Sequence, residues 1–306
     1  MDWKKRVHNI LSRPPLENEP MSLHTSLRIG GPAELLIYPQ SLEELKDVFR
    51  TARLDDIPIF VLGQGTNLLV RDEGIRGIVV NLSYVCSDCR FMNDTVRAGA
   101  ALPLSKLARE AADKGLDGLV FTTGIPGSLG GALYMNAGAY GSTISELVSE
   151  VGVLDYDGRY QLRSREELDF SYRWSNFQSE DVVIIDGVLD LQPGDKEEII
   201  TRMRAIQDER RFKHPLLPSA GSVFRNPPGR PAGKLIEEAG CKGMLAGGAE
   251  VSLQHGNFIV NKGNATADDF LTLVDLIREK VKNIFGVELE LEIRIIGGNG
   301  SEQGRR

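Results

Sequence analysis

The sequence alternates between short apolar runs and stretches in which apolar residues recur every three or four positions. Apolar runs predict buried strands at 57–62, 77–82, 148–154 and 182–191. The amphipathic stretches predict helices at 41–51, 104–114, 196–211, 233–239 and 266–285. Strands that alternate with helices are typical of an α/β (α+β) fold.

Local signals sharpen the bounds of three of these helices. Ser41 and Glu44 have the spacing of a capping box, and Gly115 is a typical residue to follow a helix. The helix at 266–285 has the clearest pattern, because Thr266 can cap its start and Gly286 can end it. Its expected buried face is Phe270, Leu273, Val274, Ile277 and Val281.

The main domain boundary is predicted after the helix at 196–211, where His214-Pro215 and Pro218 prevent its continuation. The last third of the chain predicts a smaller α/β unit with a strand at 257–260. Residues 287–295 alternate strictly between apolar and charged side chains, which predicts one further strand. We therefore divide the chain into an N-terminal helical segment (1–20), a large domain (21–213, two subdomains that meet near residue 100), a small domain (214–298) and a disordered tail (299–306).

The 306 residues suffice for two or three domains with a sizeable core. The net charge of −7 argues against nucleic acid or an anionic membrane as partner. No apolar run is long enough to span a membrane and no signal peptide is visible, so we expect a cytoplasmic protein. A monomer is a separate expectation, which these signals do not decide. Cys86 and Cys89 have CxxC spacing, but no second ligand pair follows, so we predict no metal site and incidental thiols.

The glycines cluster most clearly in two loops, GQGTN at 63–67 and GIPGSLGG at 124–131. Glycine lets backbone N–H groups approach a phosphate closely, and the second loop can place them at a helix N-terminus. Neither loop has the Walker pattern or a good dinucleotide fingerprint. The pattern alone leaves two interpretations open, namely tight turns between strands and helices, or a site for a diphosphate-bearing ligand.

The two loops resemble the FAD-diphosphate loops of PCMH-type flavin-binding domains. Within that superfamily, the sequence resembles the UDP-N-acetylenolpyruvoylglucosamine reductase family from residue 22 to residue 297. The motifs that carry the resemblance occur in the family's order: HTSLRIGGP (24–32), NAGAYG (136–141), YRWS (172–175), GSVFRNP (221–227), AGKLI (232–236) and EIR (292–294). Each motif is moderately specific alone, and the six in order make a specific match.

The resemblance implies a PCMH-type FAD domain of two α/β subdomains followed by a smaller α/β domain that binds substrate. It also implies FAD as cofactor, NADPH as co-substrate, and reduction of the enolpyruvyl group of UDP-N-acetylglucosamine enolpyruvate in peptidoglycan synthesis. The residues that it assigns to FAD are Gly63, Gln64, Gly65, Thr66, Asn67, Leu68, Thr123, Gly124, Pro126, Gly127, Ser128, Gly130, Gly131, Asn136 and Gly138. The residues that it assigns to substrate are Tyr172, Arg225, Asn226 and Lys234.

The family's catalytic arginine, serine and glutamate correspond to Arg173, Ser222 and Glu292. Hydride addition to an enolpyruvyl group creates an enolate, which needs electrostatic stabilisation and a proton donor. By local sequence alone, each residue has a simpler interpretation: a surface arginine, a turn serine and a glutamate on a solvated strand face. The order of the motifs favours the catalytic roles.

The sequence departs from longer family members, which carry a loop with a tyrosine that covers the substrate. No tyrosine occurs between Leu191 and Gly221, so the chain resembles the shorter class. Two other functions are compatible with the sequence. One is an oxidase of the same superfamily, which often holds FAD covalently through His or Cys; the candidate residues here lie outside the glycine loops. The other is a non-catalytic module that binds a flavin or a nucleotide sugar.

Overall fold

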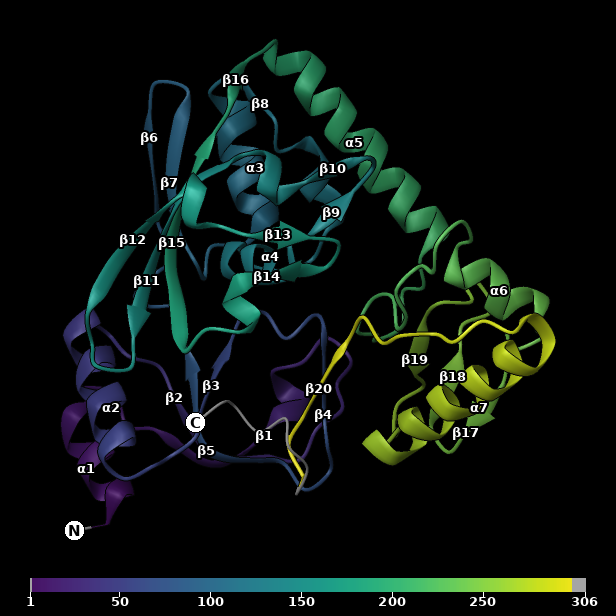
Figure 1. Cartoon of the computed structure of the whole chain (residues 1–306), viewed down its shortest axis with the longest axis horizontal. Helices are drawn as coiled ribbons and strands as arrows, with labels where there is room; N and C mark the ends of the chain where they lie inside the picture. The colour runs from purple at the N-terminus through teal and green to yellow at the C-terminus, as the bar shows by residue number, and fades with distance from the viewer. Residues whose placement is uncertain (1, 299–306) are drawn as a thin grey trace.

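The chain folds into a large lobe and a small lobe (Figure 1), which the computed structural model describes for residues 2–298. Helix α5 (Lys196–Lys213) runs from the large lobe toward the small lobe, and the chain enters the small lobe after it. The α/β prediction is confirmed. The predicted tail at 299–306 lies outside the described residues.

The first sheet of the large lobe has three parallel strands and one antiparallel edge strand. Helix α1 (Trp3–Ile10) packs beside α2 (Leu42–Leu54), and Val7, Leu45, Val48 and Phe49 are buried with the sheet. The predicted N-terminal helix is therefore confined to α1, because residues from Leu16 pair with a neighbouring strand instead. The strands, in sheet order, are β1 (Leu16–Pro20), β2 (Pro32–Ile37), β5 (Ile75–Asn81) and β3 (Ile59–Leu62).

The predicted capping box of α2 is only half formed. The Ser41 hydroxyl accepts a hydrogen bond from the Glu44 N–H (3.2 Å), as expected. The Glu44 carboxylate, however, accepts from the N–H groups of Gln40 (2.8 Å) and Ser12 (3.2 Å) rather than from Ser41. Glu44 thereby also fixes the segment that follows α1.

The second sheet of the large lobe is antiparallel, and its strands share one continuous core with the first sheet. Helix α4 (Leu129–Met135) packs on the central strand, and α3 (Leu104–Asp113) lies beside α5. The strands, in sheet order, are β12 (Tyr160–Ser164), β11 (Val148–Asp155), β15 (Val182–Asp190), β7 (Thr95–Gly99) and β6 (Cys89–Met92). Three short pairs complete the lobe: β8 (Leu116–Asp117) with β16 (Gln192–Pro193), β9 (Gly138–Ala139) with β10 (Ser142–Thr143), and β13 (Phe170–Ser171) with β14 (Trp174–Ser175).

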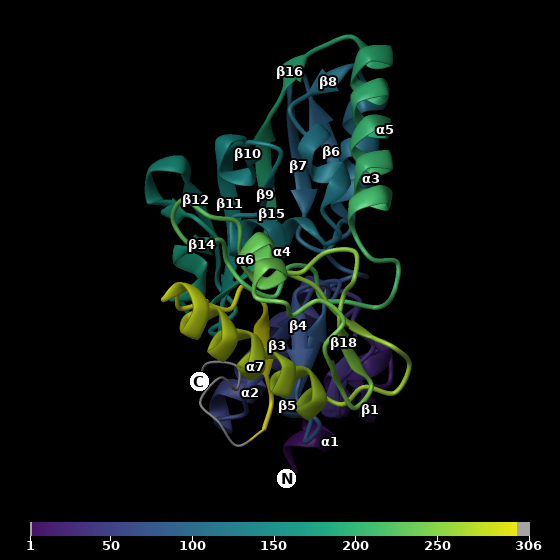
Figure 2. The same cartoon turned by 90° about the vertical axis from the view of Figure 1, so that its right-hand side faces the viewer.

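The small lobe, which faces the viewer in Figure 2, is a three-stranded antiparallel sheet with two helices. Helix α7 (Ala267–Phe285) has the predicted capping box of Thr266 and Asp269, and it ends at Gly286 with φ of 67°. All five residues predicted for its apolar face are buried. The other elements are α6 (Ala232–Glu238), β17 (Leu245–Ala246), β18 (Ala249–Val251) and β19 (Ile259–Asn261).

The predicted strand at 287–295 is wrong as a single strand. Only β20 (Arg294–Ile296) is regular, and it pairs in parallel with β4 (Leu68–Val70) of the large lobe. Before it, the Glu292 N–H donates to the carbonyl of Val223 in the small lobe (2.8 Å), whereas the Arg294 N–H donates to that of Asn67 (3.0 Å). The backbone partner changes from one lobe to the other within two residues. The alternating residues 287–295 therefore form an extended segment that crosses from the small lobe to the large lobe.

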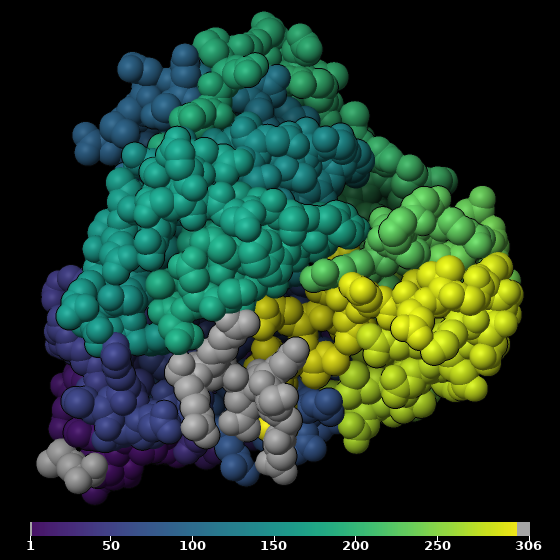
Figure 3. Space-filling view, viewed as in Figure 1, coloured from purple at the N-terminus to yellow at the C-terminus, as the bar shows by residue number. Residues whose placement is uncertain are grey.

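No helix within residues 2–298 is both long and apolar enough to cross a membrane. The two lobes meet along a broad seam in the space-filling view (Figure 3), where the yellow C-terminal residues lie beside the teal large lobe.

Candidate active site

The two predicted glycine loops line one cavity of about 760 Å³. The first glycine loop (63–67) joins β3 to β4, and the second glycine loop (124–131) leads into α4. The Thr66 hydroxyl donates to the Pro126 carbonyl at 2.9 Å, which ties the loops together. A cavity of this size is suited to a cofactor.

The first glycine loop offers free hydrogen-bond donors. Within the described part of the chain, the backbone N–H groups of residues 64–67 donate to no other residue. Gly65 has φ of +63°, and a Cβ there would lie 2.1 Å from the His24 carbonyl oxygen, so only glycine fits. Consecutive free N–H groups beside a cavity are typical of an anion site.

The second glycine loop works differently from the prediction. The N–H groups of Leu129 and Gly130 donate to the carbonyls of Leu102 (3.0 Å) and Ala100 (2.8 Å), so the first turn of α4 does not present them to a ligand. Gly130 serves close packing, because a Cβ would lie 2.9 Å from Ala100 Cβ. Among the described residues, the N–H groups of Gly127 and Ser128 have no partner, so the donors of this loop precede the helix.

Three further residues predicted to contact FAD have different surroundings. The Thr123 hydroxyl is buried without a hydrogen-bond partner, although Thr123 is not part of the cavity wall. Gly138 and Leu68 line the cavity. Asn136 does not: it ends α4 with φ of 43°, and its side chain bonds Ser171 and Ser145. Its left-handed backbone and these two hydrogen bonds give Asn136 a structural role, and its predicted contact with the cofactor stays a prediction.

Arg173 lies on the two-residue turn between β13 and β14. Its φ of 57° is unusual for a residue with a side chain, and such backbone strain is found most often at functional sites. The Gln178 amide holds the turn by donating to the Arg173 carbonyl (3.2 Å) and to the Tyr134 carbonyl (2.8 Å). The guanidinium of Arg173 lies 5.1 Å from the centre of the Tyr172 ring.

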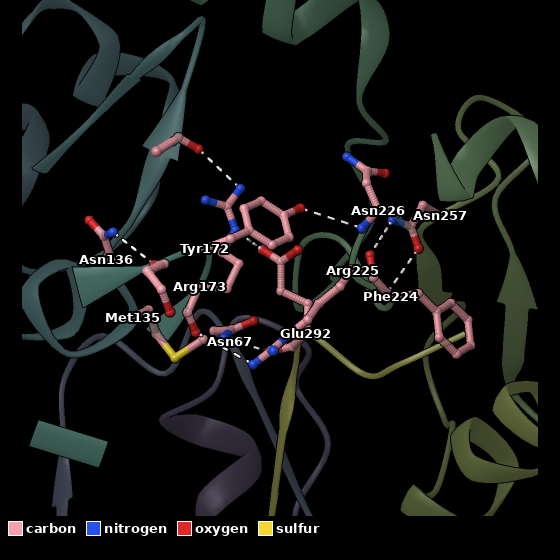
Figure 4. A network of polar contacts seen from close by, with 12 residues as sticks. Asn67, Met135, Asn136, Tyr172, Arg173, Phe224, Arg225, Asn226, Asn257 and Glu292 are labelled. Carbon is pink, nitrogen blue, oxygen red and sulfur yellow. Dashed lines mark hydrogen bonds and ion pairs between the residues drawn. The ribbon is translucent and has the colours of Figure 1, made fainter. Parts of the chain in front are cut away.

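Arg173 and Glu292 meet although 119 residues separate them in sequence. Arg173 Nε donates to Glu292 Oε1 at 2.7 Å, and Nη2 donates to the Gly138 carbonyl at 3.1 Å (Figure 4). Burial raises the pKa of the Glu292 carboxyl, and the Arg173 charge opposes that rise without cancelling it. The pair joins the turn of the large lobe to the crossing segment from the small lobe.

Ser222 lies in the wall of the same cavity, in loop 219–223 of the small lobe. Gly221 has φ of 78°, and the Val223 N–H donates to the Asn257 carbonyl (2.9 Å). The buried Asn257 side chain holds Phe224 at both its N–H (2.9 Å) and its carbonyl (2.8 Å), as Figure 4 shows. Across the described residues, the Ser222 hydroxyl has no hydrogen-bond partner, so it is free to serve a ligand.

A second cavity, of about 690 Å³, also includes Ser222 in its wall. It contains two predicted substrate residues, Asn226 and Lys234. Asn226 Oδ1 accepts from the Ala232 N–H at 2.9 Å, and Lys234 is exposed, 3.9 Å from Glu238. Ser222 therefore lies in the walls of two cavities: the first contains the free backbone donors, and the second lies within the small lobe.

The other two predicted substrate residues bridge the lobes. The Tyr172 hydroxyl accepts from the Asn226 N–H at 3.4 Å, and Arg225 Nη2 approaches the Arg173 carbonyl at 3.5 Å. Arg225 Nε is buried without a partner. The structure therefore brings Arg173, Glu292, Ser222, Tyr172, Arg225 and Asn226 to the seam between the lobes, whereas Lys234 lies within the small lobe.

Sequence reasoning gave no role to Arg294 or His214 of the cavity wall, and it named Arg210 only as a further charge for the diphosphate. Arg294 donates to the Tyr134 hydroxyl and lies 5.0 Å from that ring. Arg210 donates to the Gly124 carbonyl, and His214 follows at the end of α5. Burial, then the Arg210 charge, lowers the pKa of His214 to about 4. Arg294 could have been found, because it lies two residues after Glu292 on the same side of an extended segment.

The cysteines give a testable expectation of low reactivity. Burial raises the pKa values of Cys86 and Cys89 to about 12, and Cys89 Sγ donates to Glu110 Oε2 at 3.0 Å. About 10⁻⁵ of each thiol is then ionised at pH 7, so a thiol reagent should react slowly with the native protein and rapidly in denaturant. Two fast, reversibly oxidised thiols in the native protein would contradict this.

No group of three or more His, Cys, Asp or Glu residues suited to a metal ion occurs within residues 2–298.

Comparison with known proteins agrees with this geometry. Residues 33–162 match an FAD binding domain, and residues 212–296 match the C-terminal domain of UDP-N-acetylenolpyruvoylglucosamine reductase. The reductase of Syntrophomonas wolfei is 44% identical to this chain, and the alignment covers 92% of this chain and 94% of that protein. The reductase of Heliobacterium modesticaldum is 47% identical, and the alignment covers 94% of this chain and 92% of that protein. The crystal structure of the Thermus caldophilus reductase superposes with a TM-score of 0.78, at 38% identity over 91% of this chain and 98% of that one.

The fold, the glycine loops and the charged group beside them define an FAD-binding oxidoreductase with a separate C-terminal domain. Within that class, the chain belongs to the UDP-N-acetylenolpyruvoylglucosamine reductase family. This membership favours the reductase over the oxidase and over the non-catalytic module.

Proposed function

We propose that this chain uses NADPH to reduce the enolpyruvyl group of UDP-N-acetylglucosamine enolpyruvate, giving UDP-N-acetylmuramate for peptidoglycan synthesis. The observation that carries the proposal is the meeting of Arg173, Glu292 and Ser222 at one cavity that the free donors of the glycine loops also line. The enzyme is expected to act as a monomer in the cytoplasm.

The residues of the first cavity fit FAD. The free N–H groups of residues 64–67, 127 and 128 suit its diphosphate. When bound, FAD supplies the hydride carrier between NADPH and the enolpyruvyl double bond. The chain's own residues must hold the substrate, stabilise its enolate and deliver one proton.

Arg173 is suited to the enolate and the adjacent carboxylate of the substrate. Its guanidinium stays charged at every working pH and presents a planar set of donors. Nε and Nη2 are engaged by Glu292 and Gly138, which fixes the plane of the group before substrate arrives. A preorganised cation lowers the energy of a developing negative charge because it needs no reorganisation during the reaction.

Ser222 Oγ is the proposed proton donor. Hydride addition gives one new C–H bond and leaves an enolate. The C=C electron pair of the enolate then takes the Ser222 proton to form the second C–H bond on the neighbouring carbon, while the oxygen lone pair re-forms the carboxylate C=O. A serine hydroxyl is a weak acid, so the alkoxide that it leaves must be stabilised by the site and reprotonated from solvent. The net reaction consumes NADPH and one proton.

The second cavity is suited to the rest of the UDP-sugar. Its wall contains Asn226 and Lys234, whose amide and ammonium can donate to a nucleotide and its diphosphate. Arg225 adds a positive charge at the seam, with Nε still free. Because Ser222 lies in the wall of both cavities, a ligand of the small lobe that extends toward the large-lobe cavity would lie close to the proposed proton donor.

A visible spectrum of the purified protein under anaerobic conditions tests the proposal. The yellow colour of bound FAD should disappear on addition of NADPH and return on addition of the enolpyruvyl UDP-sugar, without oxygen. A protein that cannot be reconstituted with FAD would contradict the flavin site. A bleached protein that the UDP-sugar leaves bleached would contradict the substrate.

Glu292→Gln should change the pH dependence of stability. The pKa of Glu292 is raised in the folded protein, so its contribution to stability is full below the ordinary value of 4.5 and is lost as pH rises through the folded pKa. The glutamine variant, which still accepts from Arg173, should therefore gain melting temperature relative to the wild type between acidic and neutral pH, while its reaction slows. Melting curves across this range check the result.

Glu290→Gln is the matched control, because Glu290 lies two residues earlier and its side chain is 79% exposed. Its melting temperature should follow that of the wild type at every pH. A Glu292→Gln variant that also follows the wild type would show that burial of this carboxyl has no effect on stability.

A further inference from the structure

The turn at 22–29 contacts both lobes, although it precedes nearly all of the large lobe in sequence. Met21 is buried in the core beside β2 and β5, whereas Leu27 and Ile29 are buried in the core of the small lobe with Phe224 and Phe270. A segment of seven residues thus passes from one hydrophobic core to the other. It lies directly at the seam that separates the two halves of the site.

Ser26 is the residue of this turn that bonds both sides of the cavity. Its N–H donates to the carbonyl of Gly65 in the first glycine loop at 3.0 Å. Its hydroxyl donates to the carbonyl of Ser219 in loop 219–223 at 2.7 Å, with a longer approach of 3.4 Å to Gly65. One residue therefore links the loop with the free N–H donors to the loop that carries Ser222.

Both ends of this link are firmly held. The Gly65 backbone is in contact with the turn, since a Cβ on Gly65 would lie 2.1 Å from the His24 carbonyl oxygen. On the other side, the buried Asn261 amide donates to the carbonyls of Leu27 (3.1 Å) and Arg28 (3.2 Å). Asn261 also donates through its N–H to Pro218, the residue before Ser219 (2.9 Å). The link cannot shorten or lengthen without disturbing these contacts.

Loop 219–223 is held within the small lobe by the bridge of Ser219 with Val260 and by the backbone bond of Val223 to Asn257, whereas the Ser26 hydroxyl reaches it from the turn that also bonds the first glycine loop. Two residues, Ala220 and Gly221, separate Ser219 from Ser222, and Gly221 has no atoms near its Cβ position and a φ of +78°. Val223 is fixed beyond it by its bond to the Asn257 carbonyl. Ser222 therefore lies between two anchors, Ser219 and Val223, and the first of these is held to the large lobe by the Ser26 hydroxyl.

We infer that Ser26 is a positioning residue for proton transfer: its hydroxyl fixes loop 219–223, and with it Ser222 Oγ, relative to the first glycine loop. The inference rests on the proposed function. Ser26 itself touches no reacting atom. Because reaction rates fall steeply when a donor is displaced by even a fraction of an ångström, loss of one bond should affect the proton-transfer step selectively.

Ser26→Ala tests the inference in the full-length holoenzyme by anaerobic stopped flow. Reoxidation of the reduced protein by the UDP-sugar should slow by about tenfold, within the 10²-fold range for a donor misplaced by 1 Å. FAD affinity and reduction by NADPH should stay within about twofold of the wild type, as for substitutions that break no functional contact. The solvent isotope effect on reoxidation should increase, because proton transfer becomes more strongly rate-limiting.

Two further variants separate positioning from general damage. Thr25→Val removes a hydrogen bond inside the turn, from the Thr25 hydroxyl to the Ile29 carbonyl (2.9 Å), and should change melting temperature more than reoxidation. Ser26→Thr keeps the hydroxyl and should restore reoxidation to within about twofold of the wild type.

The outcomes are distinguishable. Equal slowing of both half-reactions in Ser26→Ala, no slowing at all, or identical effects of Ser26→Ala and Thr25→Val would overturn the inference. A Ser26→Thr variant as slow as Ser26→Ala would also overturn it. A wild-type protein whose bleached flavin is not reoxidised by the UDP-sugar would instead refute the proposed function.

Discussion

Ser222→Ala is expected to slow reoxidation by the UDP-sugar by about 10²- to 10⁴-fold, the usual contribution of a positioned general acid. Reduction by NADPH should be nearly unchanged, because that half-reaction needs no proton from Ser222. The substitution removes a hydroxyl without a hydrogen-bond partner in the described part of the chain, so the fold should lose little stability. Single-turnover stopped flow, with each half-reaction followed separately by flavin absorbance, measures the difference.

Ser219→Ala is the matched control for Ser222→Ala. Ser219 lies in the same loop, and its carbonyl, which accepts from Ser26, is kept in the variant. Both half-reactions should proceed at wild-type rates in this control. If Ser222→Ala impairs both half-reactions equally, or neither, then the proton comes from another group.

Arg173→Ala is expected to slow the same half-reaction by about 10²- to 10³-fold, as loss of a preorganised charge at a developing oxyanion does. It should also destabilise the protein, because Glu292 remains largely buried with its strongest partner removed. Removal of one partner of a buried ion pair costs about 3–5 kcal/mol of folding stability. Because both side chains keep some exposure to solvent, we expect a loss near the lower end of this range. The pKa of Glu292 should rise further, so the loss of stability should grow as the pH increases.

The double variant Arg173→Ala, Glu292→Gln separates the two effects. A neutral amide needs no charged partner, so the double variant should recover melting temperature at neutral pH relative to Arg173→Ala. It should not recover the rate, since the enolate still lacks its cation. Recovery of rate together with stability would show that Arg173 acts only by holding Glu292.

Arg173→Lys keeps the positive charge but loses the planar guanidinium. Its rate of reoxidation should therefore lie between those of the wild type and Arg173→Ala.

The elements that the sequence predicted well carry their signals locally. Helix α7 has a capping residue, a five-residue apolar face and a terminal glycine within one stretch, and each signal agrees with the structure. The two glycine loops were located correctly for the same reason. Such signals need no knowledge of what lies elsewhere in the chain.

The site depended on partners that are distant in sequence, which local patterns cannot supply. The ion pair of Arg173 with Glu292 joins segments 119 residues apart, and only the order of the family motifs pointed to it. The prediction for 287–295 found the alternation of side chains but not the change of backbone partner from one lobe to the other. The left-handed backbone of Asn136 and its side-chain bonds to Ser171 and Ser145 are likewise visible only in three dimensions.

Strand β20 has a consequence for the order in which the protein can mature during synthesis. It follows every other described element, and it pairs with β4, directly after the first glycine loop. Asn67 of that loop accepts from the Arg294 N–H and donates through its side chain to the Glu292 carbonyl (3.2 Å). Domains fold largely as they leave the ribosome. The first glycine loop of the large lobe, however, gains these bonds only after residues 292–296 have been synthesised. A chain that ends before Arg294 should therefore bind FAD poorly, although it contains every glycine of both loops.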